Sequence, residues 1–404
     1  MSGTVRTAVI GVGNIGSIHA RQIFAGNIRG MELAALCDTD REKCRGFETV
    51  FPGVPVFASD GELFENSRRL GLDAVIVSVP HRFHTEIAEA AFARGLHVLC
   101  EKPEAVELRC ARRLNEIAAR SGKVFGIMFN QRTEPLFARA REIIKSGAMG
   151  ALKRSSWTVT NWYRTQTYYD SGSWRATWDG EGGGVLINQA PHNLDLWIWM
   201  LGMPERVRGF CYQGKYHRIG VEDEATVFAE FPGGATGVFV TSTGEAPGTN
   251  RLEMAFDKGK IVLENGLLTM TELSVSERDF CFTSDSGSGM PEMTVRTFSY
   301  EAGRDGHSLI LENFAAAVLT GEELISPGYD GVNELSVSNA AYLSSWTDRW
   351  IELPMSDGDC DVFSGILEEK SRDEKKKRGE GARAGDKDMR DAENEYSRRW
   401  SARW

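Results

Sequence analysis

The sequence has few of the features that mark secreted, metal-binding or membrane proteins. Its 404 residues include seven cysteines, an odd number, and no two of them form a C-x-x-C pair. This pattern argues against a disulfide framework and against a thiolate zinc site. No apolar run approaches the roughly 18 residues of a membrane-spanning helix, and the nearest candidate covers only residues 194–201. We therefore expect a cytoplasmic protein with no signal peptide, no membrane partner and no metal site.

A surplus of positive charge is also missing. Lysine and arginine together number 47 against 57 aspartates and glutamates, which gives a net charge of −10. Because phosphate backbones bind basic surfaces, nucleic acid is not an expected partner. Apolar material is plentiful, with 41% hydrophobic and 10% aromatic residues. A chain of this length exceeds what one core usually organises, so we expect two domains.

The first third of the chain alternates short β-branched runs with helical patterns. Residues 85–94 and 108–119 have helical spacing. The runs that read as strands are 5–10, 32–37, 74–79, 97–100 and 123–128. Such alternation predicts an N-terminal Rossmann domain over residues 1–130, with a doubly wound parallel sheet.

After about Gly147 polar and apolar residues alternate, which is typical of an antiparallel sheet. The predicted strands are 152–160, 225–231, 237–243, 252–256 and 261–264, and the predicted helices are 194–201, 308–319 and 332–346. The fold class is therefore α/β, with a C-terminal α/β domain over 131–360 that contains a large, open, mostly antiparallel sheet. Residues 361–404 are rich in charge and poor in apolar residues, which predicts a disordered tail. A helical extension that binds a partner is the alternative.

A glycine motif directly follows the first predicted strand. Gly11, Gly13 and Gly16 form G-x-G-x-x-G, with Asn14 and Ile15 at the start of the next predicted helix. The first glycine permits a tight turn, the second lets the backbone approach a pyrophosphate, and the third allows close helix packing. A plain glycine-rich turn is the alternative, but the position after a strand favours a dinucleotide site.

Asp38 stands 22 residues beyond Gly16, at the end of the second predicted strand. An acidic residue there hydrogen-bonds the adenosine ribose and repels a 2′-phosphate, so NAD is preferred to NADP. The nearby Arg41 leaves NADP open. Ser78, Pro80 and His81 lie at the carboxyl end of the strand over 74–79, where they either line the nicotinamide ribose or belong to an ordinary loop.

Two further segments carry a family resemblance. Glu101-Lys102-Pro103 ends the strand over 97–100, and residues 182–195 run Gly-Gly-Gly-Val-Leu-Ile-Asn-Gln-Ala-Pro-His-Asn-Leu-Asp. With the glycine motif, these segments resemble the Gfo/Idh/MocA family of glucose-fructose oxidoreductases and inositol dehydrogenases, from about Val5 to Pro354. The positions of His19, His84, residues 130–132 and residues 308–321 are similar to that family's pattern as well.

The resemblance implies that Lys102 and His192 are catalytic. An imidazole titrates near neutral pH, so His192 is a suitable general base for a hydroxyl proton. The ammonium group of Lys102 can stabilise a developing alkoxide or carbonyl oxygen. A solvated surface lysine and a helix-capping histidine are the structural alternatives. The remaining cofactor contacts expected from the pattern are His84, Glu101, Lys102 and Gln131.

The sequence departs from the family's commoner pattern at Asn188. An aspartate usually stands four residues before the histidine, and asparagine cannot carry its charge. Asn188 can still hydrogen-bond and orient His192 or a substrate hydroxyl, so we count it with the catalytic residues. Because Pro191 indicates a helix start nearby, Asn188 is alternatively a helix cap.

Residues 168–178 combine aromatic rings with polar groups, as sugar sites do. Trp174, Arg175 and Tyr169 are candidates for substrate contact there, besides Lys102, Asn188 and His192 and, from the resemblance, Arg132. A loop packed on the sheet is the alternative.

Taken together, the motifs predict an NAD-dependent oxidoreductase that transfers a hydride to or from a secondary hydroxyl of a sugar, glycoside or polyol. The resemblance implies a homodimer or homotetramer. A non-catalytic NAD-binding sensor or scaffold and a nucleotide-sugar dehydrogenase are the alternatives.

Overall fold

The computed structural model describes residues 3–172, 174–301 and 303–381. Its N-terminal part contains a six-stranded parallel sheet in the order β3-β2-β1-β4-β5-β6. The strands are β1 (Val5–Ile10), β2 (Met31–Cys37), β3 (Val56–Phe57), β4 (Ala74–Val77), β5 (His97–Cys100) and β6 (Phe125–Ile127). The order reverses at β1 and β4, which is where doubly wound sheets bind ligands. The prediction of a Rossmann sheet is confirmed.

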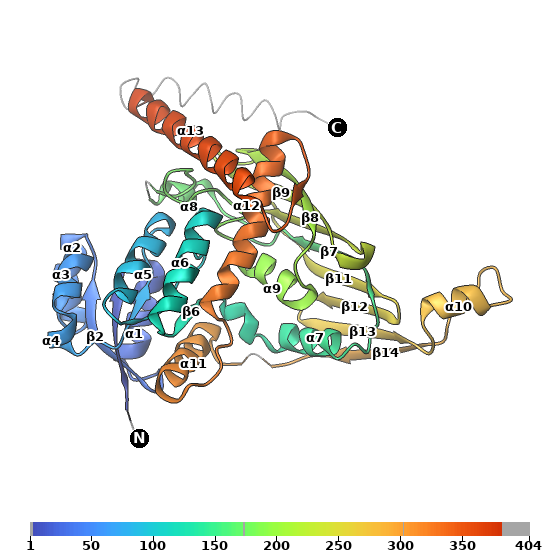
Figure 1. Cartoon of the computed structure of the whole chain (residues 1–404), viewed down its shortest axis with the longest axis horizontal. Coiled ribbons are helices and arrows are strands. Elements are labelled where there is room, and N and C mark those ends of the chain that lie inside the picture. The colour runs from blue at the N-terminus through green and yellow to red at the C-terminus, as the bar shows by residue number, and fades with distance from the viewer. Residues whose placement is uncertain (1–2, 173, 302, 382–404) are drawn as a thin grey trace.

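Helices cover both faces of this sheet. The N-terminal helices are α1 (Asn14–Phe24), α2 (Arg41–Val50), α3 (Asp60–Glu65), α4 (Ser67–Leu70), α5 (His84–Phe92), α6 (Leu108–Ser121) and the short η1 (His81–Phe83). The α5 and α6 helices pack on one face, and α1 packs on the other beside α11 (Gly306–Thr320). The α11 helix lies within the predicted C-terminal domain, yet it completes the core of the first sheet (Figure 1).

The second sheet has nine strands in the order β14-β13-β12-β11-β7-β10-β9-β8-β15. Neighbouring strands are antiparallel except β10 and β7, so the predicted mostly antiparallel sheet is confirmed. The strands are β7 (Leu152–Val159), β8 (Arg206–Gln213), β9 (Glu222–Glu230), β10 (Thr236–Ser242), β11 (Asn250–Phe256), β12 (Gly259–Glu264), β13 (Leu267–Leu273), β14 (Met293–Phe298) and β15 (Ile351–Glu352).

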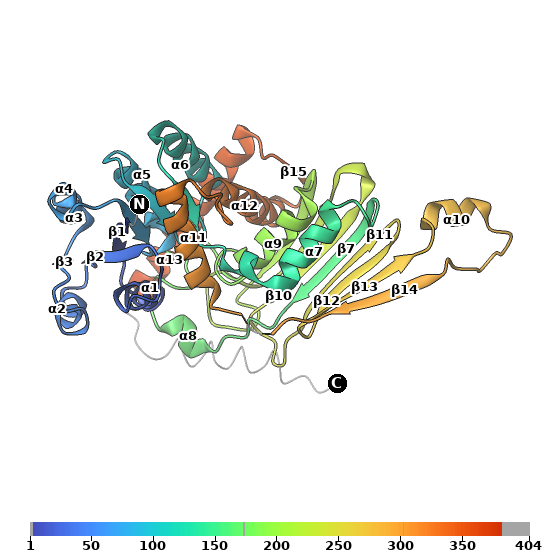
Figure 2. The ribbon, with the colours of Figure 1, turned by 90° about the horizontal axis from the view of Figure 1, so that it is seen from below.

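One side of the second sheet packs against helices (Figure 2). The α7 (Pro135–Lys145), α9 (Pro191–Leu201) and α12 (Gly331–Thr347) helices bury this face in a large apolar core. The remaining helical segments are α8 (Gln166–Asp170), α10 (Glu277–Thr283), η2 (Asn130–Thr133), η3 (Pro232–Gly234) and η4 (Gly328–Asp330). No helix among the described residues is both long and apolar enough to cross a bilayer.

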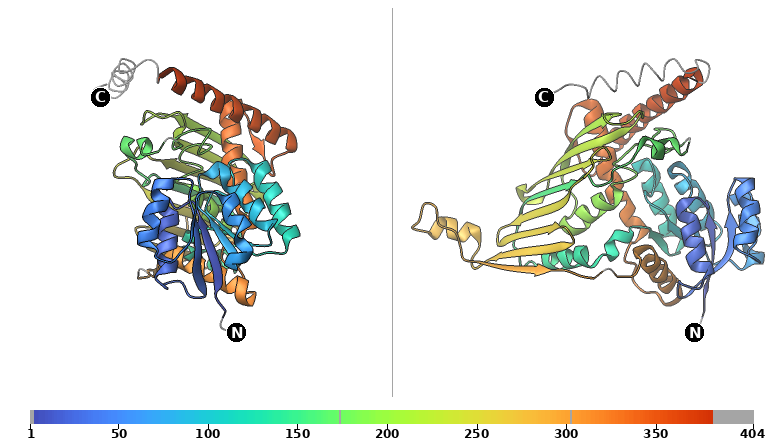
Figure 3. Two further views of the ribbon diagram at one scale, coloured as in Figure 1. Left: turned by 90° about the vertical axis from the view of Figure 1, so that its left-hand side faces the viewer. Right: turned by 180° about the vertical axis from the view of Figure 1, so that it is seen from behind.

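The predicted disorder of 361–404 is wrong for its first half. The α13 helix (Asp357–Gly381) crosses the C-terminal end of α12 and packs against it near its own start (Figure 3). Its Phe363 is almost fully buried and stacks on Trp346 with ring centroids 5.3 Å apart, and Cys360 and Leu367 are buried too. Apolar residues spaced along one helix face therefore order a segment whose average composition is polar. Residues 382–404 of the predicted tail lie outside the described residues.

Ionisable side chains are buried where the two sheets meet. Arg132 pairs with Asp195 of α9 at 2.5 Å and with Asp330 at 2.6 Å. Beside this network Glu104 and Glu334 have no solvent exposure, and none of their carboxyl oxygens has a hydrogen-bond partner among the described residues. Burial, together with the charge of Asp195, raises the pKa of Glu334 to about 8. Glu334 is therefore protonated at neutral pH in the folded chain.

The buried acid predicts that stability falls as pH rises. Because the pKa of Glu334 is higher in the folded state than in the unfolded one, its favourable contribution is complete below about pH 4.5 and is lost as pH rises to about 8. An uncharged Glu334→Gln variant escapes this loss. We expect it to be more stable than wild type by roughly 2–4 kcal/mol at pH 9 and by much less at pH 5, as measured by urea unfolding.

The matched control for this measurement is Glu86→Gln, which makes the same change at an exposed position of α5. Its stability difference from wild type is expected to be small and the same at both pH values. An equal effect of Glu334→Gln at pH 5 and pH 9 would show that this carboxyl does not titrate as described.

Candidate functional site

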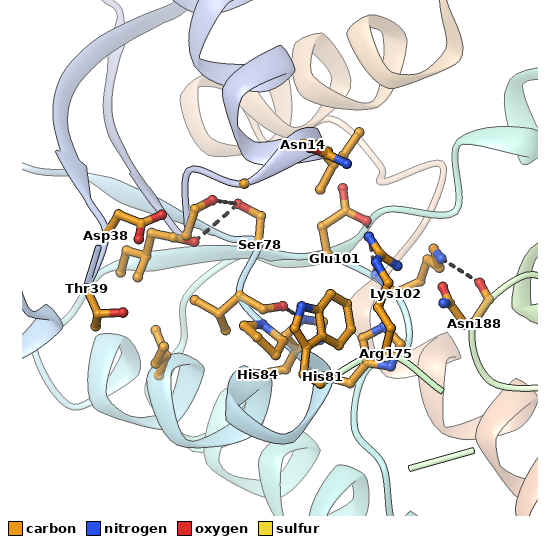
Figure 4. A pocket seen from close by; sticks show the side chains of 18 of the residues that line it. Asn14, Asp38, Thr39, Ser78, His81, His84, Glu101, Lys102, Arg175 and Asn188 are labelled. Carbon is orange, nitrogen blue, oxygen red and sulfur yellow. Dashed lines mark hydrogen bonds between the residues drawn. The ribbon is translucent and has the colours of Figure 1, made fainter. Parts of the chain in front are cut away.

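A cavity of about 610 Å³ lies at the carboxyl ends of the parallel strands, between the two sheets. The glycine loop, Asp38 and the ends of β4 and β5 line its first half, as Figure 4 shows. Residues from α8 and from the glycine-rich segment before α9 line the second half. The lining includes these predicted residues: Gly11, Gly13, Asn14, Ile15, Asp38, Ser78, Pro80, His81, His84, Glu101, Lys102, Trp174, Arg175, Asn188 and His192.

The glycine loop has the geometry that a bound pyrophosphate requires. Gly11 has a φ of +86°, and a Cβ atom there would lie 2.6 Å from the carbonyl oxygen of Ser78. Gly13 is the N-cap of α1, so the free N–H groups of that helix point towards the cavity. Gly16 does not line the cavity. A Cβ atom on Gly16 would lie 2.0 Å from the carbonyl oxygen of Gly11, so this glycine allows the close packing of helix and loop.

Asp38 holds the loop in place and also lines the cavity. Its Oδ2 accepts a hydrogen bond from the backbone N–H of Val12 at 2.8 Å, and its Oδ1 accepts one from Asp40 at 2.9 Å. Arg41 is not among the lining residues, whereas Lys43 is, with its Nζ 3.7 Å from Asp40. The adenosine end of the cavity therefore contains more carboxylates than cations.

The residues after β4 are fixed by hydrogen bonds. The hydroxyl of Ser78 donates to the carbonyl oxygen of Gly11 at 2.8 Å. The ring nitrogens of His84 lie 2.7 Å from the carbonyl oxygen of Pro103 and 2.8 Å from that of Val79. His84 thereby connects the end of β4 to the segment that carries Lys102.

Lys102 bridges the two halves of the cavity. Its Nζ donates a hydrogen bond to the carbonyl oxygen of Asn188 at 2.7 Å. Burial lowers the pKa of Lys102, and the charges of Glu101 and Glu181 oppose that shift. Glu101 is itself held at 2.8 Å by the ring of His19, from the buried side of α1. Burial alone would raise the pKa of Glu101, but the hydrogen bond and charge of His19 lower it to about 2.

His192 stands on the same cavity, at the start of α9. Its Nδ1 is buried and has no hydrogen-bond partner among the described residues. Burial and the nearby charge of Lys102 lower the pKa of His192 to about 3. The imidazole is therefore neutral at physiological pH, which is the state in which it can accept a proton.

Asn188 faces a buried carboxyl group that the sequence analysis did not identify. Its side-chain Nδ2 donates to Glu181 Oε1 and lies 3.3 Å from the hydroxyl of Tyr168. Glu181 also accepts a 2.6 Å hydrogen bond from the backbone N–H of Ala176. Burial raises the pKa of Glu181 to about 7, and the charge of Arg175 partly opposes the shift.

The aromatic loop contributes partly different residues from those predicted. Trp174 and Arg175 line the cavity, and Arg175 donates to the hydroxyl of Tyr168 at 2.8 Å. Tyr169 is buried and hydrogen-bonds Thr243 instead, so Tyr168 replaces it as the lining tyrosine. The α8 helix explains the difference, because consecutive residues on a helix face different directions.

An ordered contact from α13 supports this loop from outside. Glu374 accepts hydrogen bonds from the backbone N–H groups of Trp178, at 3.0 Å, and Asp179, at 3.4 Å. Lys375 pairs with Asp179 at 2.8 Å, and Lys370 lies over the Trp178 ring. The helix predicted to be disordered thus fixes the loop that separates Trp174 from Glu181.

Besides Gly16 and Tyr169, two further predicted contacts are not among the residues that line the cavity. Arg132 lies outside it, because Asp195 and Asp330 hold its guanidinium group in the buried network described above. Gln131 belongs to the same short η2 segment and is also absent from the lining.

Several other lining residues were not predicted from the sequence. Gln189 and Tyr168 lie within the segments 182–195 and 168–178, which were predicted to contribute to the site through other residues. Among the others, Trp162, Arg164 and His307 carry no sequence signal of their own, and they reach the cavity from parts of the chain outside the motifs.

Sequence profiles of two domains match the chain. Residues 5–129 match the oxidoreductase family with an NAD-binding Rossmann fold, and residues 137–262 match the GFO/IDH/MocA C-terminal domain. The chain is 33% identical over 190 residues to 1-carboxy-3-chloro-3,4-dihydroxycyclohexa-1,5-diene dehydrogenase of Comamonas testosteroni. That match covers 46% of this chain and 45% of the relative, so it spans about half of the relative's length.

Longer matches are more distant. Myo-inositol 2-dehydrogenase of Thermotoga maritima is 26% identical over 356 residues, which cover 86% of this chain and 98% of the relative. The crystal structure of the WlbA dehydrogenase from Bordetella pertussis, in complex with NADH and UDP-GlcNAcA, has a TM-score of 0.72 at 22% identity. It covers 87% of this chain and 100% of its own, and it shows a shared fold.

The glycine loop, the lysine after β5 and the histidine of α9 therefore stand where the two matched domains meet. The chain belongs to the Gfo/Idh/MocA family of oxidoreductases and has that family's NAD-binding Rossmann fold.

Proposed function

We propose that the protein is a dehydrogenase that oxidises a secondary hydroxyl of a sugar, glycoside or polyol, or reduces the corresponding ketone. The observation that carries the proposal is the convergence of Lys102 and His192 on the cavity that the glycine loop lines. These groups come from different domains and are 90 residues apart in the sequence. Bound NAD would supply the hydride acceptor at the nicotinamide carbon.

The side chains around the cavity carry out proton transfer, charge stabilisation and substrate binding. His192 is neutral and takes the hydroxyl proton as the carbon–hydrogen bond breaks. The ammonium group of Lys102 donates to the substrate oxygen and stabilises its developing charge. Asn188 orients the hydroxyl by hydrogen bonding, and Trp174 and Arg175 contact the rest of the substrate.

The substrate class follows from the chemistry of the lining. Flat rings at Trp162, Tyr168 and Trp174 suit the apolar C–H faces of a sugar or cyclitol. Two relatives are named as dehydrogenases of a dihydroxycyclohexadiene and of myo-inositol, which supports a hydroxylated ring as the substrate here. An inositol, an anhydrosugar or a glucoside is therefore the preferred substrate, ahead of a nucleotide-sugar.

We also propose a cytoplasmic homodimer or homotetramer. All seven cysteines are free, as expected in a reducing compartment. The side of the second sheet that faces away from α12 carries Phe210, 44% exposed, and Tyr212, 48% exposed. The strand register places Phe228 and Val238 on the same side, so a second copy would cover several apolar side chains there.

The adenosine end of the cavity predicts a preference for NAD. Asp38→Asn keeps the side chain's size while removing the charge that repels a 2′-phosphate. We expect its dissociation constant for NADP to fall by about tenfold or more, and that for NAD to change less. Fluorescence titration with both dinucleotides measures the two constants. The control, Glu42→Gln, removes one charge at an exposed neighbouring position and should leave both dissociation constants unchanged. Wild-type protein that binds NADP more tightly than NAD would contradict the predicted preference.

The catalytic assignment predicts loss of turnover with cofactor binding retained. Wild-type protein with NAD and a panel of inositols, anhydrosugars, glucosides and uronic acids should form reduced nicotinamide, followed by its absorbance. His192→Ala is expected to lower kcat by about 10²- to 10⁴-fold, the usual contribution of a positioned base. Lys102→Met should lower kcat to a similar extent, while Lys258→Met, at an exposed position, should not.

The same experiment tests the sensor alternative. Tight NAD binding by wild type with no reduced nicotinamide on any substrate would favour a non-catalytic role. Full turnover by His192→Ala would leave the dehydrogenase intact but remove the imidazole from the mechanism.

A further inference from the structure

The carboxyl group of Glu181 is buried at the edge of the catalytic cluster, where the sequence motifs gave no reason to expect one. It is 1% exposed, and each of its carboxyl oxygens accepts a hydrogen bond. One bond comes from the backbone N–H of Ala176 and the other from the side chain of Asn188. A buried carboxylate costs free energy unless such bonds and nearby charges compensate for it. Its position therefore needs an explanation beyond packing.

Asn188 connects this carboxyl group to the catalytic lysine. Its backbone carbonyl oxygen accepts the hydrogen bond from Lys102 Nζ at 2.7 Å, while its side-chain Nδ2 donates to Glu181. The same residue thus touches the ammonium group on one side and the carboxylate on the other. Other charged or titratable groups near Glu181 include Arg175, with its Nη1 at 3.7 Å, and His81, whose ring donates to the Glu181 carbonyl oxygen at 3.1 Å. The charge of Glu181 also acts on Tyr169.

The carboxylate also determines how the Asn188 amide is turned. A carboxylate can only accept hydrogen bonds, so the amide must present its nitrogen to Glu181. The amide oxygen is then the atom left to accept a hydrogen bond on the cavity side. An aspartate at position 188, as in the commoner family pattern, would instead place two carboxylates within hydrogen-bond distance, where like charges disfavour ionisation of both.

We propose that Glu181 supplies the negative charge that the commoner family pattern has at position 188, and that it acts as a positioning residue through Asn188 and Lys102. In this arrangement Asn188 keeps a function although it lacks the charge of an aspartate. It connects the carboxylate of Glu181 to Lys102 through hydrogen bonds, and its amide oxygen can accept a hydrogen bond from the substrate hydroxyl. Glu181 also favours the charged form of Lys102, because it adds a negative charge near the ammonium group.

The inference rests on the hydride-transfer function proposed above, and a charge-exchange experiment separates the two. The variants are E181Q, N188D and the double variant E181Q/N188D, with Asp170→Asn at an exposed position of α8 as the matched control. Two properties are measured on the full chain with NAD bound: kcat/KM as a function of pH, and the pKa of Lys102. The second uses ¹³C NMR of dimethylated lysines, with the Lys102 signal identified by its loss in Lys102→Arg.

E181Q should lower kcat/KM at pH 7 by roughly ten- to a hundredfold, the size of effect typical of removing an outer partner of a functional group. Its pH profile should lose the acid limb near pH 7, because the group whose pKa is about 7 is gone. The Lys102 pKa should fall by about one unit or more. The control should keep the wild-type kcat/KM, pH profile and Lys102 pKa.

N188D tests the interaction between Glu181 and residue 188 by changing residue 188 while Glu181 is kept. Adding a second carboxylate should raise the Lys102 pKa and move the acid limb to higher pH, since one proton is then shared between the two acids. The double variant returns the single charge to position 188. It should therefore have a higher kcat/KM than E181Q and a Lys102 pKa close to that of wild type.

Three results would overturn the inference: an unchanged pH profile in E181Q, an unchanged Lys102 pKa in both single variants, or a double variant no more active than E181Q. If the Lys102 pKa shifts as expected while wild type oxidises no compound of the panel, the charge arrangement stands and the proposed function fails. If turnover is found but the exchange has no effect, the reverse holds.

Discussion

The ammonium group of Lys102 is half-buried between two sheets, and burial disfavours its charged form. Nearby negative charge is therefore needed to keep it protonated, and this need explains the carboxyl groups placed around it. Glu101 supplies the charge from the parallel sheet, while Glu181 supplies it from the C-terminal half. Hydrogen bonds support both carboxyl groups: the ring of His19 lies 2.8 Å from Glu101, and the backbone N–H of Ala176 donates to Glu181. The lysine and its partners therefore couple the two domains electrostatically at the place where the cavity forms.

The same burial separates the protonation states of the cluster. The pKa of Glu101 is lowered to about 2, that of His192 is lowered to about 3, and that of Glu181 is raised to about 7. A permanently charged acid, a neutral imidazole and an acid that titrates near neutral pH thus lie within one cavity lining or directly behind it. Such separation is what allows neighbouring groups to take different roles in proton transfer.

The features that were predictable from the sequence are those with a strong local signal. The strand over 97–100 was placed to the residue, because β-branched and apolar residues end abruptly at Glu101-Lys102-Pro103. The glycine loop was equally clear, and a Cβ atom on Gly11 or Gly16 would come too close to neighbouring backbone atoms. Lys102 and His192 were found through a resemblance, and the structure brings them to one cavity.

The features that were missed depend on contacts between distant segments. Arg132 was expected at the substrate, but two aspartates from other elements bind it. Glu181 carries no motif, and its importance follows only from its hydrogen bond to Asn188. The α13 helix was not predicted, because the average composition of residues 361–404 is polar. Phe363 and its apolar neighbours along one face of the helix are nevertheless buried.

The contact between α13 and the aromatic loop has a consequence for how specificity can change. The resemblance noted in the sequence ends near Pro354, and α13 begins just after it, at Asp357. Glu374 and Lys375 nevertheless hold the backbone of the segment that follows Trp174 and Arg175. Variation in this appended helix can therefore reshape the side of the cavity that Trp174 and Arg175 line, while Lys102 and His192 stay unchanged.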